Sequence, residues 1–178
     1  LTTYFITPSL IKRLVQAGIT GRDRNKPGNP EIAEMGGFSI ASGLTAALLL
    51  AIGLSAKKEI LIFLLAAVST ILIASIVGIV DDLFILSQHV KALLPVLAAI
   101  PLMAVKAGTD IMFFPFIGQV KLGILYVLIF VPLGVTGAAN AYNMLAGLNG
   151  LEAGLGFISA TTLFISSVMA GSKIAAII

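Results

Sequence analysis

ILIFLLAAVSTILIASIVGIV, residues 60–80, contains no charged side chain and is followed directly by Asp81-Asp82. An α-helix rises about 1.5 Å per residue, so about 20 apolar residues are enough to cross the hydrocarbon core of a bilayer. This stretch therefore predicts a transmembrane helix that ends on two carboxylates.

Further charge-free stretches flank this one on both sides. They run over residues 35–56, 122–151 and 153–172, with a shorter one over 92–105. The whole chain is 58% hydrophobic and 11% charged, whereas soluble domains carry about a quarter charged residues. The pattern predicts an all-α, polytopic transmembrane helical bundle in one integral membrane domain over residues 1–178. Five to six spans are expected: a partial one ending near Val15, then 37–56, 60–80, 91–107, 122–137 and 153–170.

The charges and reactive side chains narrow the possible functions. A net charge of +3 and a pI near 9.3 suggest nucleic acid in a soluble protein, but here the basic residues lie between apolar runs and suit anionic lipid or phosphate. We therefore expect no nucleic-acid partner. The absence of cysteine excludes disulfides and thiolate chemistry, and a single histidine, His89, argues against a His-based triad or a multi-His metal site.

Alternating the expected spans places three polar loops, 22–34, 81–91 and 138–152, on one face of the membrane. Most of the acidic residues then share that face: Asp23, Glu31, Glu34, Asp81, Asp82 and Glu152. The loops 57–59 and 108–121 fall on the opposite face. The unusual polar chemistry of the chain is thus predicted to converge on one side.

Asp81 and Asp82 are the first candidate functional residues. Two carboxylates at a membrane boundary cost several kcal/mol unless something compensates for them. A cation is the natural compensation, and hard carboxylate oxygens suit Mg²⁺, which usually shares its site with substrate phosphates. The alternative is a solvated pair that caps the following helix, because aspartate is favourable at a helix N-terminus.

Residues 140–152, NAYNMLAGLNGLE, form the second candidate region. Asn140 and Asn143 are three apart and share a face if the segment is helical. Gly147, Asn149 and Gly150 suit a loop whose backbone approaches a ligand closely. Amide oxygens can ligate Mg²⁺, and amide nitrogens can donate to phosphate or uracil. Helix packing through small residues would explain the glycines, but it leaves the three asparagines unexplained.

Two further features are weak when taken alone. The segment GRDRNK, residues 21–26, mixes both charge signs, as many cytoplasmic loops do. Lys91 begins an apolar stretch, where an ammonium either contacts a diphosphate or simply extends to the membrane interface.

Together these stretches resemble the polyprenyl-phosphate N-acetylhexosamine-1-phosphate transferase family, and most closely its dolichyl-phosphate GlcNAc-1-phosphotransferase branch. The resemblance rests on residues 21–26, on 34–37, on Val80-Asp81-Asp82 with Lys91 and Pro95, and on 140–154. The bacterial cell-wall branch carries an aspartate-rich loop where this chain has Ala146 and Asn149, which favours GlcNAc over a muramyl-peptide substrate. Ala33 and Ile85 depart from the expected pattern.

The resemblance implies an enzyme that transfers GlcNAc-1-phosphate from UDP-GlcNAc to a polyprenyl or dolichyl phosphate with Mg²⁺, or alternatively Mn²⁺, and releases UMP. It implies Asp81, Asp82 and Lys91 as catalytic residues and Asn143 as a metal ligand. Substrate-binding roles are expected for Asp23, Asn25, Lys26, Glu34, Asn140, Gly147 and Asn149. Because a phosphate monoester has a second pKa of about 6, no strong base is required, and we expect the acidic pair to organise the site.

The resemblance also sets expectations for the rest of the protein. The family has about ten spans, with a further metal-binding aspartate and an arginine loop later in the chain, so residues 1–178 are expected to be the N-terminal part of a longer transferase and inactive alone. We expect the site to face the cytoplasm, where nucleotide sugars occur, in a cell membrane or in the endoplasmic reticulum, and a homodimer is possible. The competing class is a membrane transporter with a polar site at one face.

Overall fold

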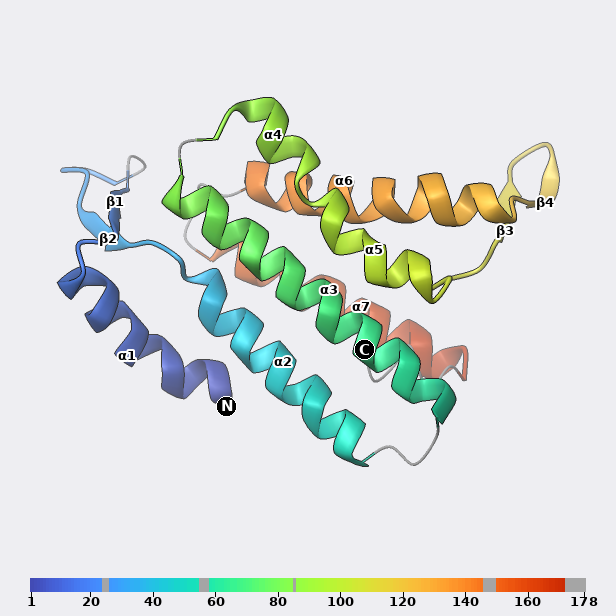
Figure 1. Ribbon diagram of the computed structural model, residues 1–178, viewed down its shortest axis with the longest axis horizontal. Coiled ribbons are helices and arrows are strands. Elements are labelled where there is room, and N and C mark those ends of the chain that lie inside the picture. The colour runs from blue at the N-terminus through green and yellow to red at the C-terminus, as the bar shows by residue number, and fades with distance from the viewer. Residues whose placement is uncertain (24–25, 55–57, 85, 146–149, 172–178) are drawn as a thin grey trace.

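The computed structural model describes residues 1–23, 26–54, 58–84, 86–145 and 150–171, which fold as a bundle of helices (Figure 1). The first three helices are α1, Thr2–Gln16, α2, Gly37–Leu54, and α3, Lys58–Leu83. Next come the short α4, Gln88–Leu93, and α5, Val96–Ala104. A π-helical turn η1, Tyr126–Phe130, leads directly into α6, Val131–Leu145, and α7, Leu151–Met169, follows.

Four helical segments of the described chain are long and apolar enough to cross a membrane. They are Gly37–Leu54, Ile60–Leu83, Tyr126–Leu145 and Leu151–Met169. α1 has 15 residues and is shorter than these four, in keeping with the partial span expected at the N-terminus. The predicted class, an all-α polytopic membrane bundle, is confirmed.

The span expected at 91–107 is instead two helices, α4 and α5, which meet at Leu94 and Pro95. Pro95 has no N–H, and its ring conflicts with the carbonyl of the residue four positions earlier, which here is Lys91. One apolar stretch therefore breaks into two helical pieces, and the break exposes backbone carbonyls near Lys91.

The span expected at 122–137 begins and ends later, at Tyr126 and Leu145. Pro132 lies in the first turn of α6, and the π-helical turn η1 immediately precedes it. A residue without an N–H disturbs the regular ladder of hydrogen bonds at this point. The loop predicted from Ala138 onwards is wrong as far as Leu145, because the helix continues through both Asn140 and Asn143.

Two short antiparallel hairpins, not anticipated from the sequence, occupy connecting segments. β1, Thr20–Arg22, pairs with β2, Glu31–Ala33, so that Arg22 lies opposite Glu31. β3, Ile111–Phe114, pairs with β4, Gly118–Lys121, so that Phe113 lies opposite Gln119. Figure 1 shows the first hairpin at one end of the bundle and the second at the other end.

The buried core lies mainly between α2 and α3. It consists of Leu48, Leu64, Ala67 and Val68, with Ile52 and Ile71 packed against it. The small side chains of Ala98 and Ala99 are buried where α5 packs between α3 and α6. Most of the remaining large apolar side chains are exposed, as expected of helices that face lipid.

Candidate active site

Asp81 and Asp82 lie in the last turn of α3, not in a loop that follows the span. The alternative in which they cap the next helix is wrong, because α4 begins at Gln88 with Ser87 at its N-cap position. Carboxylates at a helix C-terminus face the negative end of the helix dipole, which is unfavourable by about 0.3–1 kcal/mol each. Helix stabilisation therefore does not explain the pair.

Lys91 provides the positive charge nearest to this pair. Its Nζ lies 2.7 Å from Oδ1 of Asp81, and the two side chains are 38% and 25% exposed, respectively. The ion pair joins the end of α3 to α4 across the connection between them. The break at Pro95 turns α4 so that Lys91 can reach back to α3.

Asn140 fixes the third side of the site. Its Nδ2 donates one hydrogen bond to the carbonyl oxygen of Ala92 and one to the carbonyl oxygen of Thr136, each at 2.9 Å. A side-chain amide has two N–H donors, so both are used to tie α6 to the backbone beside Lys91. The helix break at Pro95 leaves the Ala92 carbonyl accessible to this bond.

A cavity of about 220 Å³ lies where these three elements meet. The polar residues that line it are Asp81, Asp82, Lys91, Asn140 and Asn143. Residues predicted from three separate segments of the sequence are thus brought together at one end of the bundle, which is also the end that carries the β1–β2 hairpin (Figure 1).

The β1–β2 hairpin adds charge beside the acidic pair. The backbone N–H of Met35 donates a hydrogen bond to the carboxylate of Asp82, and Glu34 lies close enough to act on Asp82 electrostatically. Glu34 packs over Gly21, where an added Cβ would collide with its carboxylate. Three carboxylates, those of Glu34, Asp81 and Asp82, therefore share this end of the molecule.

Some predicted residues are not brought into this cavity. Asp23 and Lys26 form an ion pair of 3.3 Å next to β1, and neither lines the cavity beside Asp82. Asn25, Gly147 and Asn149 lie outside the described residues. Gly150 begins α7 in the left-handed conformation with φ of 83°, which only glycine adopts without strain.

The apolar wall of the cavity escaped the sequence reasoning. Ala74 and Gly78 precede Asp82 at intervals of four, which places all three on one face of α3. The same three residues also line an apolar cavity of about 350 Å³ between α2 and α3, together with Phe38, Leu44 and other side chains. Asp82 thus stands between a polar and an apolar space, and this spacing was the signal that could have revealed it.

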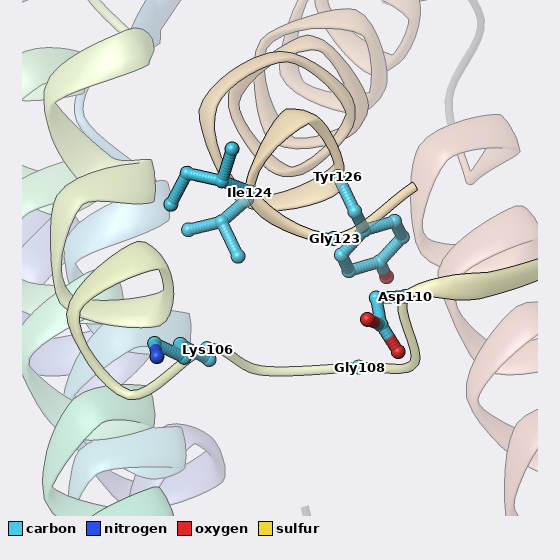
Figure 2. Close-up of a pocket in the computed structure, with 7 residues that line it drawn as sticks. Lys106, Gly108, Asp110, Gly123, Ile124 and Tyr126 are labelled. Atoms are coloured by element: carbon cyan, nitrogen blue, oxygen red, sulfur yellow. The ribbon is translucent and has the colours of Figure 1, made fainter. Parts of the chain in front are cut away.

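A larger cavity, about 380 Å³, lies at the opposite end of the bundle, at the base of the β3–β4 hairpin (Figure 2). Lys106, Asp110 and Tyr126 supply its polar groups, and in Figure 2 the Tyr126 hydroxyl points toward the Asp110 carboxylate. It contains none of the residues predicted for the site. We place the candidate active site in the smaller cavity, because the paired carboxylates, the lysine and the amides converge there.

The side chains of the smaller cavity suit a divalent cation that shares its site with a ligand. Within the described residues, no group of three or more His, Cys, Asp or Glu side chains is placed to hold a metal by itself. Mg²⁺ does not need such a cage, because it is commonly held by one or two carboxylates while waters and substrate phosphates complete its octahedron. Asp81, Asp82 and the amide oxygen of Asn143 supply hard oxygen donors of this kind.

The fold and the cavity together define an integral membrane protein with an acidic and amide-lined site at one end of its helices. Residues 62–178 match the family model described as Glycosyl transferase family 4. The chain belongs to this family.

The curated relatives carry more specific names. The chain is 35% identical over 161 residues to a protein of Saccharolobus solfataricus and 38% identical over 167 residues to one of Sulfolobus acidocaldarius, both named "Putative UDP-N-acetylglucosamine--dolichyl-phosphate N-acetylglucosaminephosphotransferase". These alignments cover 90% and 92% of this chain and 49% and 50% of the relatives. A UDP-N-acetylglucosamine–dolichyl-phosphate N-acetylglucosaminephosphotransferase of Dictyostelium discoideum is 30% identical over 196 residues, covering 95% of this chain and 46% of that protein. The chain spans about half the length of these relatives.

Proposed function

We propose that the protein carrying this chain transfers GlcNAc-1-phosphate from UDP-GlcNAc to a polyprenyl phosphate of the dolichyl type and releases UMP. The observation that carries the proposal is the cavity in which Asp81, Asp82 and Lys91 meet Asn140 and Asn143. The names of the relatives supply the substrate class. The product would be the first lipid-linked sugar of a glycosylation pathway.

The chemistry is a substitution at phosphorus. An oxygen of the polyprenyl phosphate forms a bond to the sugar-bearing phosphorus of UDP-GlcNAc, and the bond from that phosphorus to the bridging oxygen breaks. The bridging oxygen leaves with UMP. The acceptor is already an anionic oxygen nucleophile near neutral pH, because the second pKa of a phosphate monoester is about 6. Asp81 and Asp82 therefore need not remove a proton.

Lys91 has two partners to choose between in this scheme. In the structure its ammonium is paired with Asp81 at 2.7 Å. A diphosphate entering the cavity would offer it further oxygens, and the ammonium would then stabilise negative charge on the leaving UMP. Asp81 positions Lys91 for this contact while both groups remain charge-compensated.

Asn140 and Asn143 have different tasks on α6. Asn140 acts as a positioning residue, because both of its amide hydrogens hold the backbone next to Lys91. Asn143 lines the same cavity one helical turn later, and its amide oxygen joins Asp81 and Asp82 as a donor to Mg²⁺. When bound, Mg²⁺ would supply positive charge to neutralise the diphosphate oxygens.

The position of Asp82 also suits an amphipathic acceptor. Its carboxylate borders both the polar cavity and the apolar space between α2 and α3, so a phosphate head and an isoprenoid chain each find matching surroundings nearby. The cytoplasmic orientation follows from the substrate, because nucleotide sugars are made in the cytoplasm. The remaining half of the protein is expected to complete the metal and sugar sites, so residues 1–178 alone should not turn over.

The decisive experiment uses the full-length protein in membranes with UDP-GlcNAc, a polyprenyl phosphate and Mg²⁺, and it measures UMP release together with formation of the lipid-linked sugar. We expect Asp82→Asn to lower turnover by roughly a hundredfold or more, the scale on which single charge-stabilising groups act. Asp110→Asn, at the opposite end of the bundle, is the matched control. An Asp82→Asn protein that turns over like wild type would remove this cavity from the reaction.

A further inference from the structure

The β3–β4 hairpin stands at the end of the bundle opposite the candidate active site, beyond the ends of α5 and α6 (Figure 1). Its turn exposes side chains that normally avoid water. Phe116 is fully exposed, and Ile117 and Phe113 are 75% and 74% exposed. These residues do not face a neighbouring helix, so the lipid contacts of the spans do not account for them.

The alternation along the strands gives the hairpin two different faces. Ile111 and Phe113 are exposed on β3, and their cross-strand partners Lys121 and Gln119 are exposed on β4. The intervening residues, Met112 and Val120, are partly buried. One face therefore packs toward the protein, and the other presents apolar and aromatic groups that end at a lysine.

The connections of the hairpin keep it close to the membrane boundary. The chain leaves α5 at Ala104, enters β3 at Ile111, leaves β4 at Lys121 and enters η1 at Tyr126. Each connection is a few residues long, and an extended residue spans at most about 3.5 Å. The hairpin is thus tethered on both sides to lipid-facing segments and lies within about 20 Å of their ends.

The hairpin at the other end of the bundle provides an internal comparison. β1–β2 pairs Arg22 with Glu31 and precedes the acidic Glu34. Both hairpins connect apolar helices, but only β3–β4 carries aromatic residues at its turn. Apolar connection to the spans is therefore not enough to explain the aromatic turn.

We propose that the β3–β4 hairpin lies in the phospholipid head-group region of the leaflet opposite the candidate active site. Phe113, Phe116 and Ile117 enter the boundary between head groups and acyl chains, where aromatic side chains are favoured. Lys106 and Lys121, both exposed at the base of the hairpin, lie against lipid phosphates. The hairpin would then fix the depth and tilt of the helices that carry Lys91 and Asn143. The occupant of this surface is the lipid leaflet, and the inference does not depend on the transfer reaction.

The chain contains no tryptophan, which allows a direct test. Phe116→Trp is prepared in the full-length protein, with any tryptophan beyond residue 178 replaced by phenylalanine, and reconstituted into vesicles of phosphatidylcholine and phosphatidylglycerol. The tryptophan emission is measured with lipids brominated either near the top of the acyl chain or near its terminal methyl, and with aqueous acrylamide. Ile32→Trp, on the β1–β2 hairpin, is the matched control. Circular dichroism verifies that both variants retain the helical fold.

We expect lipid brominated near the top of the acyl chain to remove roughly half or more of the tryptophan emission of the Phe116→Trp protein, in keeping with interfacial aromatic side chains. Bromine near the terminal methyl and acrylamide should each quench it less, whereas Ile32→Trp should be quenched mainly by acrylamide. Strong acrylamide quenching of Phe116→Trp without an effect of either brominated lipid would place the hairpin in water. Protection from all three quenchers would mean that protein covers it, and either result overturns the proposal.

Discussion

Lys91 Nζ lies 2.7 Å from Asp81 Oδ1, although the two residues are on different helices separated by a connecting segment. The contact depends on two features of the sequence. The apolar run of α3 continues without a break to the acidic pair, and Pro95 ends α4 soon after Lys91. A continuous helix through Pro95 would leave the lysine on a different path relative to α3.

Replacing Lys91 by methionine should abolish most of the transferase activity while leaving the helices assembled. The substitution removes the ammonium but keeps a side chain of similar length, and loss of one charge-stabilising group lowers turnover by roughly a hundredfold to a thousandfold. UMP release under saturating UDP-GlcNAc measures the effect. Lys91→Arg should retain part of the activity, because it keeps the positive charge.

The matched control for this change is Lys58→Met. Lys58 is an exposed lysine at the other end of α3, so its loss removes the same charge far from the cavity. Its turnover should remain close to wild type. Equal losses in the Lys58 and Lys91 variants would show that net charge, and not the pairing with Asp81, controls the rate.

Asn143→Ala should raise the Mg²⁺ concentration needed for half-maximal activity. Loss of one oxygen donor weakens metal binding, and changes around metal sites commonly cost about 10–100-fold in affinity or activity. Activity is measured across a Mg²⁺ titration at fixed substrates. Tyr142→Phe, a change on the neighbouring residue, is the control, because the Tyr142 hydroxyl donates to Ser159 on α7 and does not line the cavity. Identical Mg²⁺ curves for Asn143→Ala and wild type would contradict the metal role.

Asn140→Asp should destabilise the bundle although the side chain keeps its shape. The carboxylate has no N–H to donate, so two hydrogen bonds are lost, each worth about 0.5–1.5 kcal/mol, and a negative charge then faces two carbonyl oxygens. The unfolding temperature in detergent should fall by several degrees. Thr162→Ala is the control, because its hydroxyl bonds only within α7. An unchanged unfolding temperature for Asn140→Asp would mean that the links to Ala92 and Thr136 contribute nothing.

Much of this architecture could be predicted from the sequence because membrane spans are specified by length and composition. The charge-free run before Asp81 predicts α3, and alternation of spans predicts that Asp81 and Asn143 share one end of the bundle. The functional meaning of that arrangement came from the spacing of polar residues within the loops and helix ends. Neither conclusion requires knowledge of how the helices pack.

The parts that escaped prediction depend on local backbone chemistry and on packing. Pro95 was visible in the sequence, but the apolar stretch around it outweighed its effect on the helix. The strands Ile111–Phe114 and Gly118–Lys121 have four residues each, too few for an alternating pattern to stand out. Asn140 and Asn143 were assigned to a loop because glycines follow them, although the helix ends only after both. The hydrogen bond from Asn140 to Ala92 joins segments far apart in the chain, so no local pattern indicates it.

Gly43→Ala should separate α1 from α2 and lower the stability of the protein. An added Cβ at Gly43 would collide with the Thr3 hydroxyl, and it would also lie 3.3 Å from Thr3 Cβ and 3.4 Å from its backbone nitrogen. Overpacking of this kind costs about 1–3 kcal/mol. Gly53→Ala is the matched control on the same helix, since a Cβ there meets nothing within 4 Å, and it should be neutral or stabilising by up to about 1 kcal/mol. Thermal unfolding of both variants in the same detergent compares them. The close approach of Thr3 to Gly43 is disproved if the two alanine variants unfold at the same temperature.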